Sequence, residues 1–391
     1  MSIQPLNDKK KILFVTGTRA DFGKMKPLAI AARDAGHAVT FFVTGMHMLR
    51  RYGLTKLEVA RVEGVERSEF VNQREGDSQD RILAATITGF SAYIAEERPD
   101  LVVVHGDRVE ALATSLVCAI NYVRCLHVEG GEVSGTIDEI YRHCNTKLCT
   151  GHLVSSEAAR RRVIRLGESP DRVFVMGSPE LDAHLQPSGV TIDAVRTHYG
   201  IPWEDYGIAV FHPVTSESES MREQAQALFD ALKQSGRNFV VIAPNNDLGS
   251  EDIFDVIHAL PESQFRLIPS MRFAYFSELL RHAGVMVGNS SAGVREAPFL
   301  GLPSLDIGTR QTNRSTSVSI TPAAATQQAV IQRFLRDTWG HRFPSDPAFG
   351  SGNAAKRFVE ILESDALWAL PKQKKFFDSE GALNPLPQLA S

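Results

Sequence analysis

Short apolar runs alternate along the chain with longer segments whose apolar residues recur every three or four positions. The runs predict buried strands, the longer segments predict helices, and their alternation is typical of a parallel α/β sheet. Strands are expected at 11–17, 39–43, 101–105, 123–128, 152–155 and 172–176, then at 208–212, 238–243, 265–268, 284–288 and 303–307. Helices are expected at 22–34, 80–97, 108–120, 137–148, 157–166, 219–235, 251–260, 272–283 and 292–300.

The alternation is interrupted once, in a stretch rich in Gly, Ser and Pro at 177–189. Because 391 residues are too many for one ordinary core, this stretch is interpreted as a linker between two domains. We expect a Rossmann-like domain at 1–180 that carries catalytic carboxylates, and a second Rossmann-like domain at 190–365. Residues 366–391 are expected to form a tail that packs back on the first domain. Both domains are α/β and doubly wound, which places the ligand site in the cleft between them.

Composition narrows the class of protein. A hydrophobic content of 43%, a charged content of 23% and a net charge of −4 predict a soluble protein without nucleic-acid or membrane partners. The four cysteines include no Cys-x-x-Cys pair, which argues against a zinc site and a disulfide framework. No run approaches the ~18 apolar residues of a membrane-spanning helix. We therefore expect a cytoplasmic protein that uses neither a metal nor a cofactor.

Acidic residues follow two strands of the first predicted domain. Asp107 and Glu129 come directly after apolar runs, and Asp138 lies shortly beyond. Carboxylates at that edge of a parallel sheet are suited to proton transfer, and we expect crowding to raise the pKa of at least one toward neutrality. In the alternative interpretation, Asp107 and Asp138 only favour helix N-termini, and Glu139 pairs with His143 one turn away. Glu129 is harder to explain in this way, because two glycines follow it.

Two strand-to-helix turns are candidate anion sites. The turn at 17–23 contains Arg19 and lacks a dinucleotide fingerprint. The turn at 288–296 places Ser290 and Ser291 at a helix start and Glu296 one turn inside, within reach of a ribose diol. Ordinary helix capping explains both serines and the glutamate equally well. Arg310 and Arg314, which follow strand 303–307, favour a diphosphate in the same cleft.

Other polar residues follow the first two strands of the second predicted domain. His212 could donate to a phosphate or take part in proton transfer, although a lone histidine at a strand end is more often structural. Asn245 and Asp247 could contact a sugar or base, or simply form a turn rich in Asn and Asp.

Read together, eight segments resemble, in order, the hydrolysing UDP-N-acetylglucosamine 2-epimerases of bacterial sialic-acid pathways. The segments are Thr16 to Gly23 (TGTRADFG), Val43 to His47 (VTGMH), His105 to Arg108 (HGDR), His127 to Glu132 (HVEGGE), Gly177 to Pro179 (GSP), His212 to Thr215 (HPVT), Gly288 to Ser291 (GNSS) and Gly308 to Gln311 (GTRQ). The match extends from about Lys11 to Arg314.

The resemblance implies two Rossmann-like domains in the GT-B arrangement and conversion of UDP-GlcNAc and water to N-acetylmannosamine and UDP, through 2-acetamidoglucal. The implied catalytic residues are Asp107, Glu129, Asp138 and His212. The expected substrate contacts are Arg19, Ala20, Asp21, Arg108, His212, Asn245, Asp247, Ser290, Ser291, Glu296 and Arg310. A homodimer or homotetramer is also expected.

Alternatives remain at this stage. The same chemistry on UDP-2,4-diacetamido-2,4,6-trideoxyglucose, in the legionaminic acid pathway, is the nearest, but that branch tends to carry Glu-Tyr where Asp21-Phe22 stand here. A non-hydrolysing epimerase is next, although the stretch 131–138 looks more like the hydrolysing kind. A glycosyltransferase would need an acceptor site, which the sequence does not reveal. A UDP-sugar sensor would bind without turnover and would not need the carboxylates.

Overall fold

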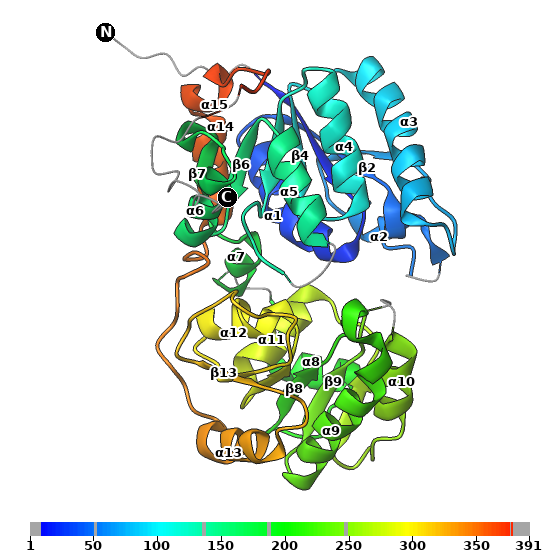
Figure 1. The fold of residues 1–391 in the computed structure, drawn as a ribbon, viewed down its shortest axis with the longest axis vertical. Helices are drawn as coiled ribbons and strands as arrows, with labels where there is room; N and C mark the ends of the chain where they lie inside the picture. Colours follow the sequence, from blue (N-terminus) through cyan, green and yellow to red (C-terminus); the bar gives the residue numbers. More distant parts are fainter. Residues whose placement is uncertain are drawn as a thin grey trace, which may run out of the picture.

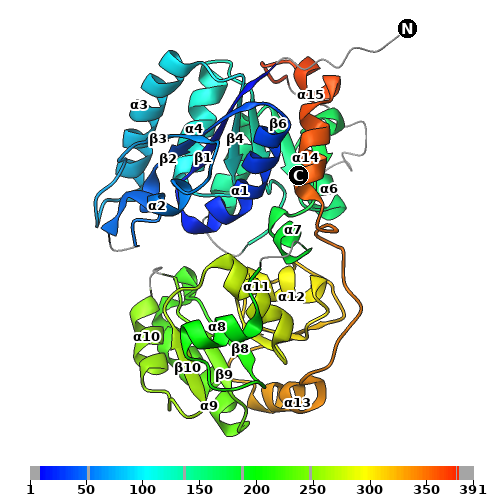
Figure 2. The ribbon, with the colours of Figure 1, turned by 180° about the vertical axis from the view of Figure 1, so that it is seen from behind.

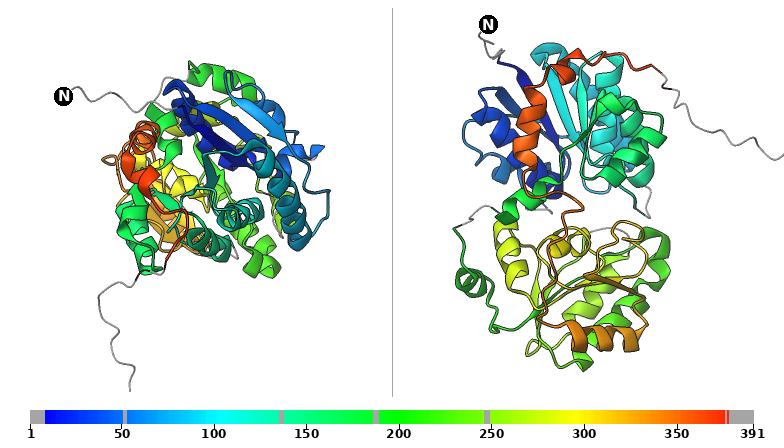
Figure 3. Two further views of the ribbon diagram at one scale, coloured as in Figure 1. Left: turned by 90° about the horizontal axis from the view of Figure 1, so that it is seen from above. Right: turned by 90° about the vertical axis from the view of Figure 1, so that its left-hand side faces the viewer.

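A computed structural model describes residues 9–50, 53–134, 138–185, 189–245, 249–375 and 377, with the side chain of Asp138 outside the described set. Two domains lie one above the other, with helix α7 between them (Figure 1). Each domain contains one parallel sheet that is covered by helices on both faces (Figure 3). No helix in these ranges is both long and apolar enough to cross a bilayer.

The first sheet has the strand order β3-β2-β1-β4-β5-β6-β7. Its central strands are buried on both sides, as expected for a sheet with helices on each face. Its strands are β1 (Lys11–Thr16), β2 (Ala38–Val43), β3 (Glu66–Glu69), β4 (Leu101–His105), β5 (Cys125–Val128), β6 (Gly151–Val154) and β7 (Val173–Val175). Its helices are α1 (Arg19–Asp34), α2 (Lys56–Val59), α3 (Gln79–Glu97), α4 (Val109–Ile120), α5 (Asp138–Leu148) and α6 (Glu157–Arg165), with 3-10 turns η1 (Gly45–Met48) and η3 (Pro170–Arg172).

The second sheet has the order β10-β9-β8-β11-β12-β13 and follows the linker helix α7 (Pro179–Leu185). Its strands are β8 (Gly207–Val210), β9 (Phe239–Ile242), β10 (Phe265–Ile268), β11 (Met286–Gly288), β12 (Ser304–Ile307) and β13 (Ile320–Ala323). Its helices are α8 (Ile192–Tyr199), α9 (Met221–Gln234), α10 (Ser250–His258), α11 (Phe273–His282), α12 (Glu296–Phe299) and α13 (Gln328–Thr338), with 3-10 turns η4 (Thr215–Ser220) and η5 (Ser291–Gly293).

The strand order reverses between β1 and β4 in the first sheet and between β8 and β11 in the second. Open α/β sheets bind ligands in the crevice at the carboxyl ends of the strands where this reversal occurs. The turn after β1 begins at Gly17 and the turn after β4 at Gly106, while Phe211 and Asn289 begin the corresponding turns of the second sheet. The fold therefore gathers these four predicted segments at two crevice positions.

Two strands were not predicted. β3 has no apolar run, and three of its four residues are exposed, because it lies at the edge of the sheet. β13 contains Pro322 and lies at the edge of the other sheet, where a missing N–H is tolerated. The segment expected to be one helix at 292–300 instead contains the short turns η5 and α12.

The last helices return to the first domain (Figure 2). Helix α14 (Ala354–Leu362) packs against α1, and α15 (Asp365–Ala369) continues along the same core. Phe358 is completely buried there, with its ring centroid 5.9 Å from that of Phe14. The sequence analysis placed residues 354–362 with the second domain, but their apolar face fits the core beside β1.

The chain thus crosses between the domains twice, once before α7 and once before α14. The two crossings contact each other, with the Ser178 amide donating to the Phe349 carbonyl at 2.7 Å. Gly177 and Gly350 both have positive φ values, of 92° and 118°. A Cβ on Gly350 would lie 2.9 Å from the Cα of Gly177, so glycine permits this close approach.

We expect Phe358→Ala to lower the free energy of unfolding by about 3–5 kcal/mol, because it leaves a cavity between α14 and the first sheet. Urea denaturation measures this change. Leu57→Ala is the matched control, since Leu57 is 55% exposed and its truncation should change stability by less than about 0.5 kcal/mol. Equal stabilities of the Phe358 variant and the control would contradict the packing described for α14.

Candidate active site

Glu129 follows β5 directly and has a left-handed backbone conformation, with φ of 66°. This conformation is unfavourable for a residue with a side chain and tends to occur at functional sites. Gly131, with φ of 77°, brings the loop against α6 so closely that a Cβ there would lie 2.3 Å from the Ala159 carbonyl oxygen. The tight turn directs a buried carboxylate toward the cleft side of the sheet.

Glu129 belongs to a buried cluster of two acidic and two basic side chains from four separate elements. Its Oε1 lies 2.8 Å from Lys24 Nζ of α1 and 2.6 Å from Nη2 of Arg295, which immediately precedes α12 in the second domain. Arg295 Nε lies 3.1 Å from Glu180 of α7, and Lys24 lies 3.6 Å from the same carboxylate. His105 Nε2 is 3.3 Å from the other oxygen of Glu129. The charges of the two carboxylates and the two cations balance.

This balance determines the protonation of Glu129. Burial alone would raise its pKa, but the charges of Arg295, Lys24 and His105 outweigh burial and hold the pKa well below its usual range. The pKa of Glu180 is lowered by the same two cations against the same effect of burial. The sequence analysis expected crowding to raise the pKa of at least one of the three carboxylates toward neutrality. The pKa of Glu129 is lowered instead, so the expectation does not hold for this residue.

A second carboxylate is positioned beside the cluster. Asp107 accepts a hydrogen bond from Arg142 of α5, which also donates to the Glu132 carbonyl at 3.0 Å. The backbone before Asp107 is fixed, because His127 and Asn145 both contact the Gly106 carbonyl oxygen, at 2.7 and 3.1 Å. Asp107 remains a quarter exposed, so it is accessible from the cleft.

Asp138 begins helix α5, but its side chain lies outside the described residues. The side chains of Asp107 and Glu129 are placed at the carboxyl ends of neighbouring strands, as predicted.

The turn after β1 places its three predicted contacts differently. Arg19 reaches across the cleft, with Nη1 2.6 Å from Ser270 Oγ of the second domain and Nη2 2.9 Å from Glu58. Ala20 is exposed on the first turn of α1. Asp21 is buried and completes a capping box with Thr18, and its Oδ2 accepts the Gly17 and Thr18 amides at 3.0 Å each. These bonds hold Asp21 as the third helical residue of a capping box whose N-cap is Thr18, whereas Arg19 faces the cleft.

The second domain holds His212 with a clamp of neutral groups. Asn289 Oδ1 accepts the His212 amide at 2.6 Å, and Asn289 Nδ2 donates to the His212 carbonyl at 2.8 Å. The backbone N–H of Asn245 donates to His212 Nδ1 at 3.0 Å. Since Nδ1 is an acceptor, the neutral ring carries its proton on Nε2. Burial, and then the charge of Arg310, lower the pKa of His212 to about 3, so this Nε2–H is a permanent donor at neutral pH.

The turn after β11 corrects the interpretation of the predicted serines. Ser290 and Ser291 are half-buried, and Ser290 caps only the three-residue turn η5, accepting the Ala292 amide at 3.4 Å. A helix of the expected length, with its dipole aimed at a phosphate, is not present here. Glu296 lies 3.3 Å from His184 of the linker helix, so in this structure its carboxylate contacts the protein.

The remaining predicted contacts are dispersed. Arg310 donates to the Asn289 carbonyl at 3.1 Å and thus lies beside the His212 clamp. Arg108 precedes α4, with its side chain 42% exposed and Nε 3.9 Å from Glu110. Asp247 lies outside the described residues. In the described ranges, no three His, Cys, Asp or Glu side chains are grouped as metal ligands.

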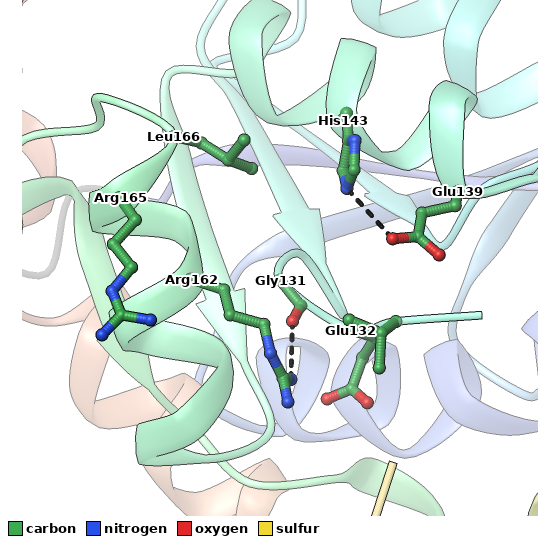
Figure 4. A pocket seen from close by; sticks show the side chains of 8 residues that line it. Gly131, Glu132, Glu139, His143, Arg162, Arg165 and Leu166 are labelled. Atoms are coloured by element: carbon green, nitrogen blue, oxygen red, sulfur yellow. Dashed lines mark hydrogen bonds and ion pairs between the residues drawn. The ribbon is translucent and has the colours of Figure 1, made fainter. Parts of the chain in front are cut away.

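A pocket of about 250 Å³ lies against the loop that follows Glu129. Figure 4 shows Arg162 donating to the Gly131 carbonyl, at 3.1 Å, and Glu139 facing His143 at 3.7 Å. The predicted helical pair of Glu139 and His143 is therefore present at the pocket wall. The Arg162 bond fixes the loop that joins Glu129 to Glu132.

Sequence reasoning did not assign three residues of the charge cluster: Lys24, Glu180 and Arg295. Arg295 lies inside the turn at 288–296 and Glu180 adjoins Pro179, but a buried ion pair leaves no periodic signal in a sequence. The only sequence signal for Glu180 was its position directly after the Gly177-Ser178-Pro179 segment.

We expect His212 to keep one neutral tautomer, protonated on Nε2, between pH 5 and 8, because its pKa is lowered to about 3. Long-range ¹H–¹⁵N spectra distinguish this tautomer from the Nδ1–H form and from imidazolium. Exposed His341 provides an internal control within the same spectra. An imidazolium signal from His212 at pH 6 would contradict the assigned hydrogen bonds.

The chain was compared with known proteins. The sequence profile of the UDP-N-acetylglucosamine 2-epimerase family matches residues 30–363. A Neisseria meningitidis protein named UDP-N-acetylglucosamine 2-epimerase is 41% identical over 94% of this chain and 99% of its own length. A Legionella pneumophila protein named UDP-N,N'-diacetylbacillosamine 2-epimerase (hydrolyzing) is 30% identical over 91% of this chain and 96% of its own.

Solved structures show the same fold. A UDP-GlcNAc 2-epimerase from Neisseria meningitidis, bound to UDP-GlcNAc, aligns with a TM-score of 0.78 at 19% identity, covering 90% of this chain and 99% of that one. The Staphylococcus aureus MnaA–UDP structure aligns with a TM-score of 0.76 at 19% identity, covering 95% and 100%. The expected GT-B arrangement of two Rossmann-like domains is confirmed. With the profile covering most of its length, the chain belongs to the UDP-N-acetylglucosamine 2-epimerase family.

Proposed function

We propose that the protein is a hydrolysing UDP-GlcNAc 2-epimerase, which converts UDP-GlcNAc and water to N-acetylmannosamine and UDP and so supplies sialic acid synthesis. The observation that carries the proposal is the buried, ionised Glu129 beside Asp107 at the cleft end of the first sheet, opposite neutral and cationic donors of the second. Such a site can move protons on a sugar while it holds a diphosphate.

The reaction has two stages. A carboxylate removes the proton from sugar C2, the bond from C1 to the phosphate oxygen breaks with its electron pair leaving on UDP, and a C1=C2 double bond forms. A proton then returns to C2 on the opposite face, and the oxygen of water bonds to C1 as one of its protons passes to a carboxylate. The product is inverted at C2 and free of the nucleotide.

The protonation states suggest how the carboxylates share these steps. A carboxylate whose pKa is held low is a weak base, but it stays charged and stabilises positive charge that develops at C1. This role suits Glu129. Proton abstraction then falls to Asp107 or to Asp138, and the other of the two protonates the glucal or activates water.

The UDP group would lie against the second domain. The Nε2–H of His212 and the guanidinium of Arg310 are the donors beside the turn after β11, where Ser290 and Ser291 add hydroxyls. Arg19 approaches the same cleft from the first domain, where it contacts Ser270. Arg108, Asn245 and Glu296 remain proposed contacts, as do Ala20 and Asp247, while the capping bonds of Asp21 favour a supporting role.

The hydrolysing type is supported by the relative that is 30% identical, which is named as hydrolysing. A link to sialic acid synthesis is supported by a 29% identical Escherichia coli relative, which is named polysialic acid biosynthesis protein P7. The 41% identical relative, whose name gives UDP-GlcNAc as the sugar, favours this substrate over the diacetylated bacillosamine sugar.

Proton NMR in D₂O tests the proposal. Incubation with UDP-GlcNAc should release free UDP and N-acetylmannosamine that carries deuterium at C2. Accumulation of UDP-ManNAc instead would identify a non-hydrolysing enzyme. An unchanged spectrum, with turnover of the diacetylated bacillosamine sugar, would assign the protein to the legionaminic acid type, and binding without any turnover would indicate a sensor.

We expect Asp107→Asn and Glu129→Gln each to reduce kcat by at least about 10²-fold, because each amide removes a charge or a proton acceptor from the reacting centre. UDP binding, measured by calorimetry, should be retained, since neither Asp107 nor Glu129 is among the proposed UDP contacts. Asp193→Asn is the matched control, because its side chain is 84% exposed and distant in the fold. Full activity of Glu129→Gln would overturn the role assigned to this residue.

A further inference from the structure

Arg295 is the largest fully buried side chain of the protein among the residues described, and it has no place in the expected substrate contacts. It belongs to the second domain, yet its guanidinium contacts Glu129 of the first domain and Glu180 of the linker helix. It also contacts Ser178 Oγ at the domain crossing and lies 5.1 Å from the ring of Phe349 at the other crossing. The side chain is therefore held on all sides before any ligand binds.

The cluster is a matter of charge balance. Glu129 and Glu180 share two cations, the buried Arg295 and Lys24, whose side chain is 19% exposed. Removing the guanidinium would leave two carboxylates against one lysine, and the second carboxylate could then remain buried only by binding a proton. Four charged or titratable groups face Glu129 from the elements packed against it: Lys24 of α1, His105 of β4, Glu180 of α7 and Arg295. A second ion pair, between Glu132 of the same loop and Arg314, lies farther from Glu129.

We propose that Arg295 is a positioning residue that acts through Glu129, holding it as an aimed, ionised carboxylate for the reaction. The inference rests on the proposed function for its role in turnover, but the contact itself does not. Arg295 touches Glu129 and Glu180, and its effect on the substrate is indirect. Lys24 supplies the matching charge from the first domain, and both cations are needed because two carboxylates share them.

The geometry makes arginine specific at this position. Its Nη2 donates to Glu129 and Ser178, while Nε lies 3.1 Å from Glu180 as an ion pair without a hydrogen bond, so one planar group contacts both carboxylates at once. A lysine offers one charge without the fork. Arg295→Lys should therefore preserve the ionisation of Glu129 but loosen its orientation.

The test compares pH profiles of kcat for the wild type, Arg295→Met and Arg295→Lys. In Arg295→Met the pKa of Glu129 should rise by about 1–3 units. The kcat of this variant should therefore fall on the acid side of its pH profile, at pH values where titration of Glu129 does not reduce the kcat of the wild type. Activity should recover toward alkaline pH, and UDP affinity should be unchanged. Arg295→Lys should lower kcat without displacing the limb.

A double variant separates charge from packing. Arg295→Met combined with Glu180→Gln restores one carboxylate to one lysine, so the displaced acid limb should return toward its wild-type position. Arg281→Met is the matched control, because Arg281 contacts the His184 carbonyl of the linker helix and does not touch Glu129. A purely structural Arg295 would lower activity equally at every pH, and the double variant would rescue nothing.

A second readout does not depend on turnover. The ¹³C shift of the Glu129 carboxyl, assigned by its loss in Glu129→Gln, reports its titration directly in wild type and variants. If the titration midpoint of Glu129 is raised in Arg295→Met but the wild type does not turn over UDP-GlcNAc, the inference about Arg295 stands and the proposed function is rejected. If the wild type turns over UDP-GlcNAc but the midpoint of Glu129 is the same in Arg295→Met, the proposed function stands and the inference about Arg295 is rejected.

Discussion

The pairing of three buried charges with one at the edge of the interior is the constraint to which the rest of the site conforms. Isolated charges are costly in a protein interior, so the buried Glu129, Glu180 and Arg295 are stable there only together with the partly exposed Lys24. Each comes from a different element, and one comes from the other domain. The relative placement of α1, the β5 turn, the linker helix and the second domain is therefore tied to a single electrostatic contact.

The two domains share a topology but differ in the chemistry that they bring to the cleft. The first sheet ends in carboxylates, with Glu129 and Asp107 each held by an arginine. The second ends in neutral hydrogen-bonding groups, in which Asn289 and the Asn245 amide fix the ring of His212. A low-pKa histidine gives a donor whose strength does not vary with pH, whereas the first domain concentrates the charges that act on protons.

Much of this arrangement could be predicted from the sequence. Apolar runs identified the central strands, because strands buried on both faces need continuous hydrophobic residues, and the carboxyl-end rule then placed Asp107, Glu129 and His212 at the cleft. Edge strands β3 and β13 lack that signal. The helix expected at 292–300 is instead divided into two short helical turns, which are separated by Val294 and Arg295.

The buried cations were beyond sequence reasoning for a different reason. Lys24 and Arg295 occupy helical or turn positions that would ordinarily be solvated, and only the tertiary fold buries them against Glu129. The low pKa of Glu129 follows from that burial and could not be derived from local spacing.

The double crossing near Gly177 and Gly350 sets the lever arms of any movement between the domains. Because the two crossings lie side by side just after β7, they restrict the second domain to rotation about an axis near β7 and oppose other movements of one domain relative to the other. With strands about 4.8 Å apart, Glu129 after β5 lies roughly 10 Å from that edge and Arg19 after β1 roughly 19 Å. A given rotation therefore displaces the contact of Arg19 with Ser270 about twice as far as the contact of Glu129 with Arg295. On this geometry the four-charge cluster lies close to the paired crossings, and the contact of Arg19 with Ser270 lies at the far side of the cleft.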